Sequence, residues 1–442
     1  MNKILVLFVP LLISVAVAAQ DSTAQAEARV PFDGYDLSWI NGQNRQQHFP
    51  LELKDRKTGE TILTGVALGD MYYNYNFARP IDNTQVASAT VGRTSEITVN
   101  LVSIGMETNY KNIIGRIWLQ AGNMLNIDQE IDGSVVHGRN TTSGDLKIIR
   151  EAAAGYHFNK LYGINMEAGI FMSYIGLESY LTQENWCYQR ATTCDFTPFY
   201  FSGARMQIYP SKKVKTEIWL VNGWQSYNSW SRYLGGGSST YWRPDENLQL
   251  VANFYGGADT KDSRVGRFHH DNSACYRYYH VPKAKGLSQA AFSINDHFGF
   301  QAGHGISGLS DYMAGIAVAN RLWFFKNIIA LTTRVDFVTN PGVYLALAPS
   351  NVRPNDFTDA IAADPAHRLN IFQGTVCFDV MPVDYVTLRL EYDYRQANVP
   401  YFAGHGGTTS PDGYTTTPIP AGWRPDLIRN ESRLILAVNF RI

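Results

Sequence analysis

The 442-residue sequence predicts an all-β protein, a single antiparallel transmembrane β-barrel of about 16 strands. Three observations predict it. Apolar and polar residues alternate in many segments, short and long connections alternate between those segments, and the composition is poor in charge but rich in aromatic residues.

The composition excludes two other classes of protein. Charged residues make up 17% of the chain, against roughly 25% in soluble domains. The formal net charge of −1 argues against a basic nucleic-acid-binding protein. The mean hydropathy is below zero, which argues against several apolar membrane helices. A barrel explains the low charged fraction and the mean hydropathy, because its strands alternate lipid-facing apolar residues with lumen-facing polar residues.

The clearest alternation is at the end of the chain. We expect residues 433–442 to form the strand that closes the barrel against the strand beginning near Gly65. Its apolar face, which we expect to contact lipid, consists of Leu434, Leu436, Val438, Phe440 and Ile442. Residues 386–395 show the same period of two, with charged residues on one face.

Weaker versions of this pattern continue along the chain. The expected strands are residues 65–77, 94–109, 113–124, 146–158, 163–177, 198–209, 214–225, 235–242, 247–257, 268–279, 287–300, 312–324, 328–339, 369–381, 385–396 and 430–442. Many of these segments support ten residues or more, whereas strands of soluble proteins average about 5–6. This length favours the barrel over a soluble all-β protein.

The connections support the same interpretation. Tight joints, such as residues 110–112 and 381–384, alternate with longer polar stretches, such as 125–145, 180–197 and 397–428. Bacterial barrels have short periplasmic turns and long extracellular loops. We expect the two kinds of connection to lie at opposite ends of the barrel.

Two segments precede the expected barrel at 59–442. Lys3, an apolar run at 4–19 and a small-residue site at Ala16-Val17-Ala18 predict a signal peptide over residues 1–19. Residues 20–58 form an N-terminal periplasmic or lumenal segment. Trp39 makes this segment more apolar than a typical linker. It is therefore expected to be either a partial plug of the barrel lumen or an extended leader.

The four cysteines give one expected disulfide. Cys187 and Cys194 bracket a short polar stretch, and an exported protein can form disulfides. We expect them to link within one extracellular loop, with two free thiols as the alternative. Cys275 and Cys377 lie inside strand-like segments and are expected to be isolated.

Several strings of residues are distinctive. They include Asn398-Val399-Pro400-Tyr401 and Trp423-Arg424-Pro425-Asp426-Leu427, and the full set covers residues 31–45, 72–82, 267–273, 391–395, 398–401 and 423–427. On these strings the chain resembles the OmpL-like β-barrel porin family of Gram-negative outer membranes. The resemblance extends over nearly the whole mature chain. It implies an outer-membrane barrel with a pore and implies no particular substrate.

Charged residues within the strands are the candidate lumen-lining residues. An arginine or lysine facing lipid at the bilayer midplane costs about 2–4 kcal/mol, so these residues should face inward. They are Arg116, Glu151, Glu167, Arg334, Asp336, Arg389, Glu391, Asp393, Arg395 and Arg433. One interpretation is that they select permeants. The other is that the four charges from Arg389 to Arg395 pair with one another and only stiffen the wall.

The sequence contains no motif for catalysis, a metal or a cofactor. There is no Gly-x-Ser-x-Gly and no Cys-x-x-Cys, and His269 and His270 are adjacent on a strand, so their side chains point to opposite faces. We expect a channel in the outer membrane for passive diffusion of small polar solutes or ions. The alternative is a barrel whose extracellular loops serve as a surface-binding or enzymatic scaffold. The expected partners are outer-membrane lipid and the barrel-assembly machinery, with no nucleic acid; the oligomeric state is left open.

Overall fold

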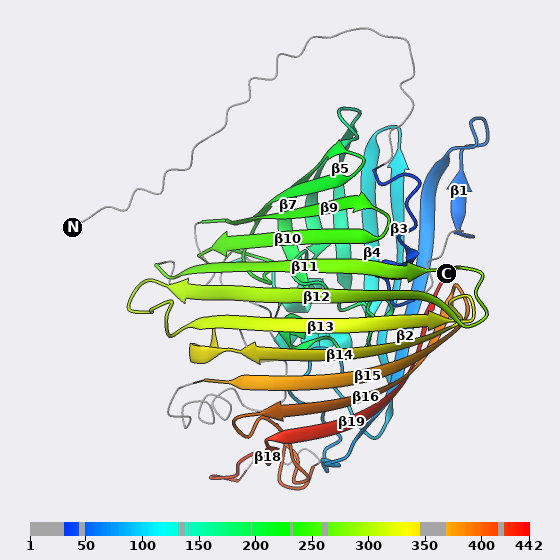
Figure 1. Ribbon diagram of the computed structural model, residues 1–442. Coiled ribbons are helices and arrows are strands. Elements are labelled where there is room, and N and C mark those ends of the chain that lie inside the picture. Colours follow the sequence, from blue (N-terminus) through cyan, green and yellow to red (C-terminus); the bar gives the residue numbers. More distant parts are fainter. Residues whose placement is uncertain are drawn as a thin grey trace.

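Sixteen long strands form a closed antiparallel barrel in the computed structural model (Figure 1), which confirms the predicted fold class. The structure describes residues 31–43, 49–130, 132, 138, 139, 141–195, 197–229, 233–258, 264–344, 368–413 and 420–442. The expected signal peptide, residues 1–19, lies outside these residues. Within them, no helix is long and apolar enough to cross a membrane.

Each barrel strand overlaps one of the segments predicted from the sequence. The barrel strands are β2 (Thr61–Asn76), β3 (Ile97–Tyr110), β4 (Ile113–Ala121), β5 (Ile149–Phe158), β6 (Ile164–Met172), β7 (Tyr200–Ser211), β8 (Val214–Val221), β9 (Gly235–Asp245), β10 (Leu248–Gly257), β11 (Gly266–His280), β12 (Leu287–Ala302), β13 (Tyr312–Phe324), β14 (Ile329–Thr339), β15 (Asn370–Val383), β16 (Val386–Ala397) and β19 (Asn430–Arg441).

The remaining elements are short. They are η1 (Ser38–Ile40), β1 (Glu52–Lys54), α1 (Met124–Glu130), α2 (Ser143–Leu146), η2 (Thr182–Glu184), α3 (Thr192–Asp195), η3 (Pro341–Val343), β17 (Phe402–Ala403) and β18 (Leu427–Ile428). β1 pairs with the start of β2, and β17 pairs with β18 in a separate two-stranded ribbon.

The last strand closes the barrel against the first. β19 pairs antiparallel with β2, and Phe440 lies opposite Gly69. A Cβ atom on Gly69 would lie 2.2 Å from Cε1 of Phe440, so this position needs a glycine for the ring to cross the seam. Alternate residues of β19 point outward: Leu436 and Phe440 are exposed, Leu434 and Val438 are half-buried, and Ile442 follows the strand and is exposed.

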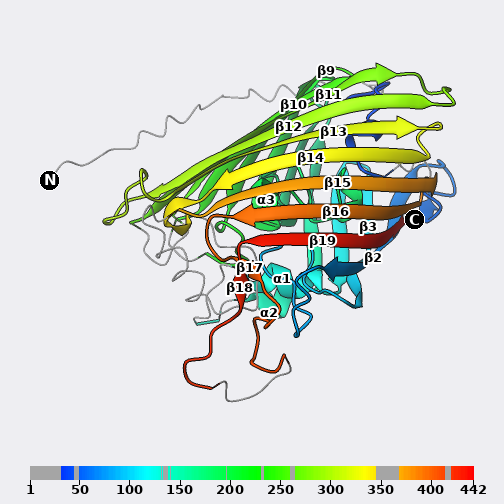
Figure 2. The same ribbon diagram turned by 60° about the horizontal axis from the view of Figure 1, so that its bottom comes forward.

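Short and long connections alternate around the barrel. Residues 111–112, 212–213, 246–247 and 384–385 join strands at one end. Lys111 and Asn112 both have positive φ angles, as a two-residue type I′ hairpin requires. The connections at the other end are longer, as between β6 and β7 or between β16 and β19 (Figures 1 and 2).

The two faces of the wall differ in polarity. On β16, Leu388 and Leu390 are 47% and 42% exposed, whereas Arg389 and Glu391, which alternate with them, are buried. The outer face therefore presents apolar side chains, and the charged side chains point into the barrel.

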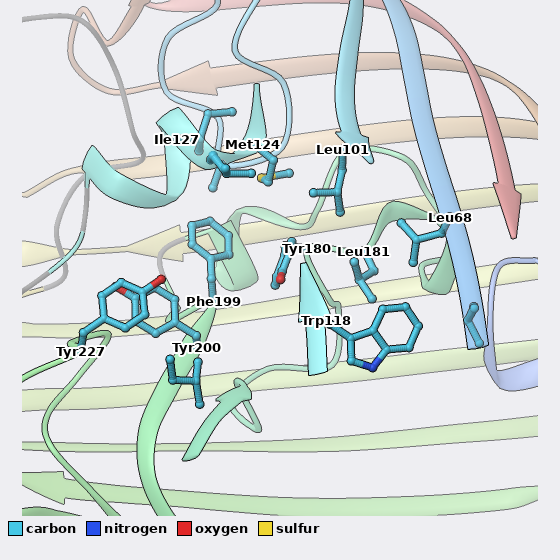
Figure 3. Close-up of a cluster of buried hydrophobic side chains, with 14 residues drawn as sticks. Leu68, Leu101, Trp118, Met124, Ile127, Tyr180, Leu181, Phe199, Tyr200 and Tyr227 are labelled. Carbon is cyan, nitrogen blue, oxygen red and sulfur yellow. The ribbon is translucent and has the colours of Figure 1, made fainter. Parts of the chain in front are cut away.

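Connecting segments fill much of the interior. Figure 3 shows one apolar cluster in which Tyr180, Leu181 and Phe199, from the connection between β6 and β7, pack with α1 and with wall residues such as Trp118. The core of this protein is thus formed inside the barrel, between the wall and chain that folds inward.

Candidate functional site

The connection between β6 and β7, residues 173–199, folds into the barrel, and we name it the inner loop. It includes η2 and α3, and α3 packs against β13, β14 and β15 (Figure 2). Tyr188 and Gln189 have no exposed surface. The expectation that residues 180–197 form an extracellular loop is therefore wrong for this segment, which lies inside the barrel.

Arginines of the wall hold the backbone of the inner loop. Arg389 donates hydrogen bonds to the carbonyl oxygens of Thr182 and Asn185, each at 2.6 Å. Arg321 donates to the carbonyl oxygen of Trp186 at 2.9 Å. Buried carbonyl groups need donors, and here the guanidinium groups supply them, beside the bond that the carbonyl of Thr182 accepts from the N–H of Asn185. The wall arginines thus replace the hydrogen bonds that a strand or helix would supply.

Carboxylates of the wall accept hydrogen bonds from backbone N–H groups of the same loop. Glu391 accepts hydrogen bonds from the N–H groups of Tyr188 at 2.6 Å and Gln189 at 2.7 Å. Asp336 accepts the N–H of Thr192 at 2.9 Å. Arg334 donates to the carbonyl oxygen of Gln189 at 2.8 Å and pairs with Glu178 at 2.8 Å. Such charge-assisted bonds are stronger than neutral ones, so they fix the position of the loop.

The charged residues of β16 pair with the neighbouring strands. The interstrand pairs in this region are Arg321–Asp379 (2.7 Å), Arg389–Asp379 (3.1 Å), Arg433–Asp393 (3.1 Å) and Arg395–Glu431. Same-face neighbours along a strand are about 6.6–6.8 Å apart, whereas facing residues of adjacent strands are about 4.5–5.5 Å apart. The charges of β16 pair across strands, and the suggested pairing along β16 from Arg389 to Arg395 is not the arrangement found. Pairs along a strand do form on β14, between Arg334 and Asp336 at 3.3 Å, and on β19, between Arg433 and Glu431 at 3.2 Å.

The other predicted charges form a second cluster on the opposite side of the barrel. Arg116 on β4 pairs with Glu151 on β5 at 3.5 Å and with Glu167 on β6. Arg205 on β7 also contacts Glu167, at 2.8 Å. These contacts all lie within the wall, so the ten predicted residues divide into a group around the inner loop and a group that pairs within the wall.

Sequence reasoning missed a second inward segment, residues 77–96 between β2 and β3. Val86 and Ser88 are fully buried, and Ser88 donates its hydroxyl to the side chain of Gln189 at 2.7 Å. Arg395 donates to the carbonyl oxygen of Ala87. The segment therefore packs behind the inner loop. A signal was present in the run of small and β-branched residues at 86–91, which is unusual for an exposed loop.

Residues 31–43, which we name the N-terminal segment, cross the end of the barrel where the short turns lie. Trp39 of this segment is 1% exposed, and its indole N–H donates to the carbonyl oxygen of Glu246 in the β9–β10 turn at 2.9 Å. Asp36 pairs with Arg277 on β11 at 2.6 Å. The carbonyl oxygen of Gly42 accepts from Arg321 at 2.7 Å. The segment contacts both the wall and the inner loop.

The predicted disulfide is wrong. Cys187 and Cys194 are both free and buried, as are Cys275 and Cys377. The Sγ atom of Cys194, in α3, lies 3.4 Å from Oδ1 of Asn295 on β12. The prediction assumed an exposed loop that needs a covalent link, but the wall already holds this loop through its backbone.

The structure brings two histidines together inside the barrel without forming a metal centre. Nε2 of His269 on β11 lies 3.1 Å from Nδ1 of His297 on β12, and Tyr344 contacts the other side of His269. His270 points away on the other face and contacts Phe254. Across the described residues, no group of three or more histidine, cysteine, aspartate or glutamate side chains is placed to hold a metal ion.

Two cavities large enough for a small solute lie between the inner loop and the wall in the described part of the chain. The first, of about 200 Å³, lies against β9 to β13 and is bounded by Ile40 and Asn41 of the N-terminal segment. The second, of about 170 Å³, lies between the inner loop and Tyr241 of β9. They share six lining residues, namely Gly176, Leu177, Glu178, Ser179, Glu184 and Tyr241. These two cavities therefore lie on the β9–β13 side, whereas the described part of the inner loop packs against β14, β15 and β16 on the other side.

Comparison with solved structures places the fold among porins. The anion-selective porin from Comamonas acidovorans is similar with a TM-score of 0.54 and 8% identity, covering 87% of this chain and 100% of that porin. OprB from Pseudomonas putida is similar with a TM-score of 0.50 and 9% identity, covering 86% of this chain and 94% of OprB. At these identities the likeness concerns the fold alone.

Comparison of the sequence gives the family. No curated protein matches this chain. The model of the family described as "Putative beta-barrel porin-2, OmpL-like" matches residues 63–419, which includes all barrel strands except the start of β2 and the closing strand β19. The chain therefore belongs to the OmpL-like β-barrel porin family and is a multi-pass β-barrel of the outer membrane, of the porin type.

Proposed function

We propose that the protein is a channel for passive diffusion of small polar solutes across the outer membrane. The observation that supports this proposal is the pair of cavities on the β9–β13 side, lined by polar side chains such as Gln249, Ser273 and Ser293. Barrels of about 16 strands are wide enough to hold an aqueous lumen when connecting segments do not fill it. Here the segments fill one side, so the passage is narrow and the solutes are small.

In this proposal the inward charges have a structural and an indirect functional role. Arg334, Asp336, Arg389 and Glu391 hold the inner loop, and the loop defines the width of the passage. The N-terminal segment narrows the end with the short turns, which we assign to the periplasm. Lipid covers the apolar outer face, and the assembly machinery of the outer membrane inserts the barrel.

Single-channel recording tests the proposal. Purified protein, folded in detergent and added to a planar lipid bilayer in KCl, should give stepwise conductance increases. Folding is verified by the different migration of unheated and boiled samples in mild SDS. If folded protein inserts without conductance, the channel proposal is wrong, and a role of the long loops as a scaffold becomes the better explanation.

A further inference from the structure

Two carboxylates mark the place where the two interior cavities adjoin. Among the six residues that line both cavities, Glu178 and Glu184 are charged and both are acidic. The basic residues are placed differently, because Arg243 lines the first cavity and Arg190 lines the second. A solute that moves from one cavity to the other therefore meets acidic groups at the junction.

The two carboxylates differ in how far they are neutralised. Glu178 pairs with Arg334 at 2.8 Å, and its carboxylate also accepts the N–H of Ala191. Glu184, in η2, makes no ion pair within the described residues, and the hydrogen bond of its side chain comes from Ser179. Arg150 and Arg441 act on it at longer range. Glu184 thus keeps more of its negative field in the cavities than Glu178 does.

The arginines of the cavities and of the neighbouring wall are engaged with protein groups. Arg243 donates to the side chain of Gln249 at 2.8 Å and lies over the ring of Phe32. Arg190 donates to the hydroxyl of Thr197 at 3.2 Å. On β13 and β16, Arg321 and Arg389 both pair with Asp379 and donate to carbonyl groups of the inner loop. The charges of Arg243 and Arg190 remain, but each of them lines only one cavity, so the charged residues that line both cavities are acidic.

From this arrangement we infer that the passage runs through the two adjoining cavities along β9–β13 and that Glu184 makes it favour small cations over anions. The inference rests on the proposed channel function and adds a class of permeant to it. A carboxylate about 6 Å from a passing ion in water-like surroundings changes the local concentration of a monovalent ion about threefold. The Debye length is about 8 Å at physiological salt, so this effect is local. A charge at the junction therefore changes the ion concentration there, whereas distant charges have little effect on it.

Reversal potentials across a KCl gradient test the inference. For the wild type we expect a K⁺ to Cl⁻ permeability ratio above one. In E184Q, whose side chain has nearly the same shape without the charge, the ratio should fall about threefold or more at low salt. E184D retains the charge and should behave like the wild type. The matched control is E60Q, which removes a carboxylate from the exposed β1–β2 turn outside the cavities and should leave the ratio unchanged.

The outcomes separate this inference from the proposed function. Folded wild-type protein without conductance contradicts the channel itself. A conducting wild type that prefers Cl⁻, or a conducting and heat-modifiable E184Q with an unchanged ratio, overturns the role of Glu184 and leaves the channel standing.

Discussion

The carboxylate of Glu391 accepts the backbone N–H of Gln189 at 2.7 Å, although 202 positions separate the two residues in the chain. The same carboxylate accepts the N–H of Tyr188. A charged residue on the inner face of a barrel strand thus acts as a cap for a buried loop. The inward charges of this region therefore position a buried segment of the chain and are not free to bind a solute.

Replacing Glu391 by glutamine should loosen the inner loop. Hydrogen bonds to a charged group contribute about 1.5–3 kcal/mol each, so the amides of Tyr188 and Gln189 should exchange about tenfold faster or more. Hydrogen exchange followed by mass spectrometry of peptides from this region measures the change. E151Q removes a buried wall carboxylate that does not contact the loop and serves as the control. Equal protection of the inner loop in wild type and E391Q would contradict the anchoring role.

Replacing Trp39 by alanine should release the N-terminal segment and widen the periplasmic end. The indole is buried and donates its N–H to the β9–β10 turn, so its loss removes both packing and a hydrogen bond. The barrel should still form, because none of its sixteen strands includes this segment. We expect a larger single-channel conductance in W39A, and a larger one still after deletion of residues 31–43. If the deletion leaves the conductance of a heat-modifiable barrel unchanged, the segment does not narrow the passage.

The thiols should be inert in the folded protein. Burial raises the pKa of Cys194 to about 12 and raises the pKa of Cys187 as well, and both residues are almost completely buried. Because the thiolate is the reactive form, a thiol reagent such as dithionitrobenzoate should not label the folded barrel and should label four thiols after boiling in SDS. An added cysteine at the exposed Glu60 should react rapidly in both states. A Cys187–Cys194 disulfide in unreduced digests would contradict this expectation.

The cation preference should depend on pH. Burial raises the pKa of Glu184 above its ordinary value of 4.5, and this effect outweighs the opposing charges of Arg441 and Arg150 and the hydrogen bond from Ser179. Glu178 and Tyr241 are the other titratable groups at the junction. Only the ionised carboxylate attracts cations, so the K⁺ to Cl⁻ ratio should fall as the pH is lowered, with its midpoint above pH 4.5. The E184Q ratio should show a weaker dependence, and an identical pH profile in the two proteins would contradict the assignment.

The barrel was predictable because its signal is local. On β16, apolar or aromatic residues alternate with polar or charged residues from Val386 to Arg395, and turns or loops separate each strand from the next. Neither feature depends on any distant part of the chain. For this reason the number of strands and their approximate limits follow from the sequence.

The interior was not predictable in the same way. The position of the inner loop depends on contacts such as that between Tyr188 and Glu391, which are 203 positions apart. Taken alone, the polar residues near Cys187 and Cys194 indicate an exposed loop, and the predicted disulfide rests on that exposure. Polar residues can equally be buried when charged side chains on an opposing wall satisfy them. The presence of Trp186 and Tyr188 in this stretch was the available sign that it lies inside.

The seam between β2 and β19 also constrains the order of folding. Asn76 contacts Glu431 across it, and 355 positions separate these residues, so the barrel cannot close until the last strand has been synthesised. The inner loop, in turn, needs partners on β14, β15 and β16, which are made after it. Contacts of such large sequence separation are slow to form. Before the barrel forms, the inner loop therefore lacks its hydrogen bonds to β14, β15 and β16. The interior reaches its final packing only when these strands close around the loop.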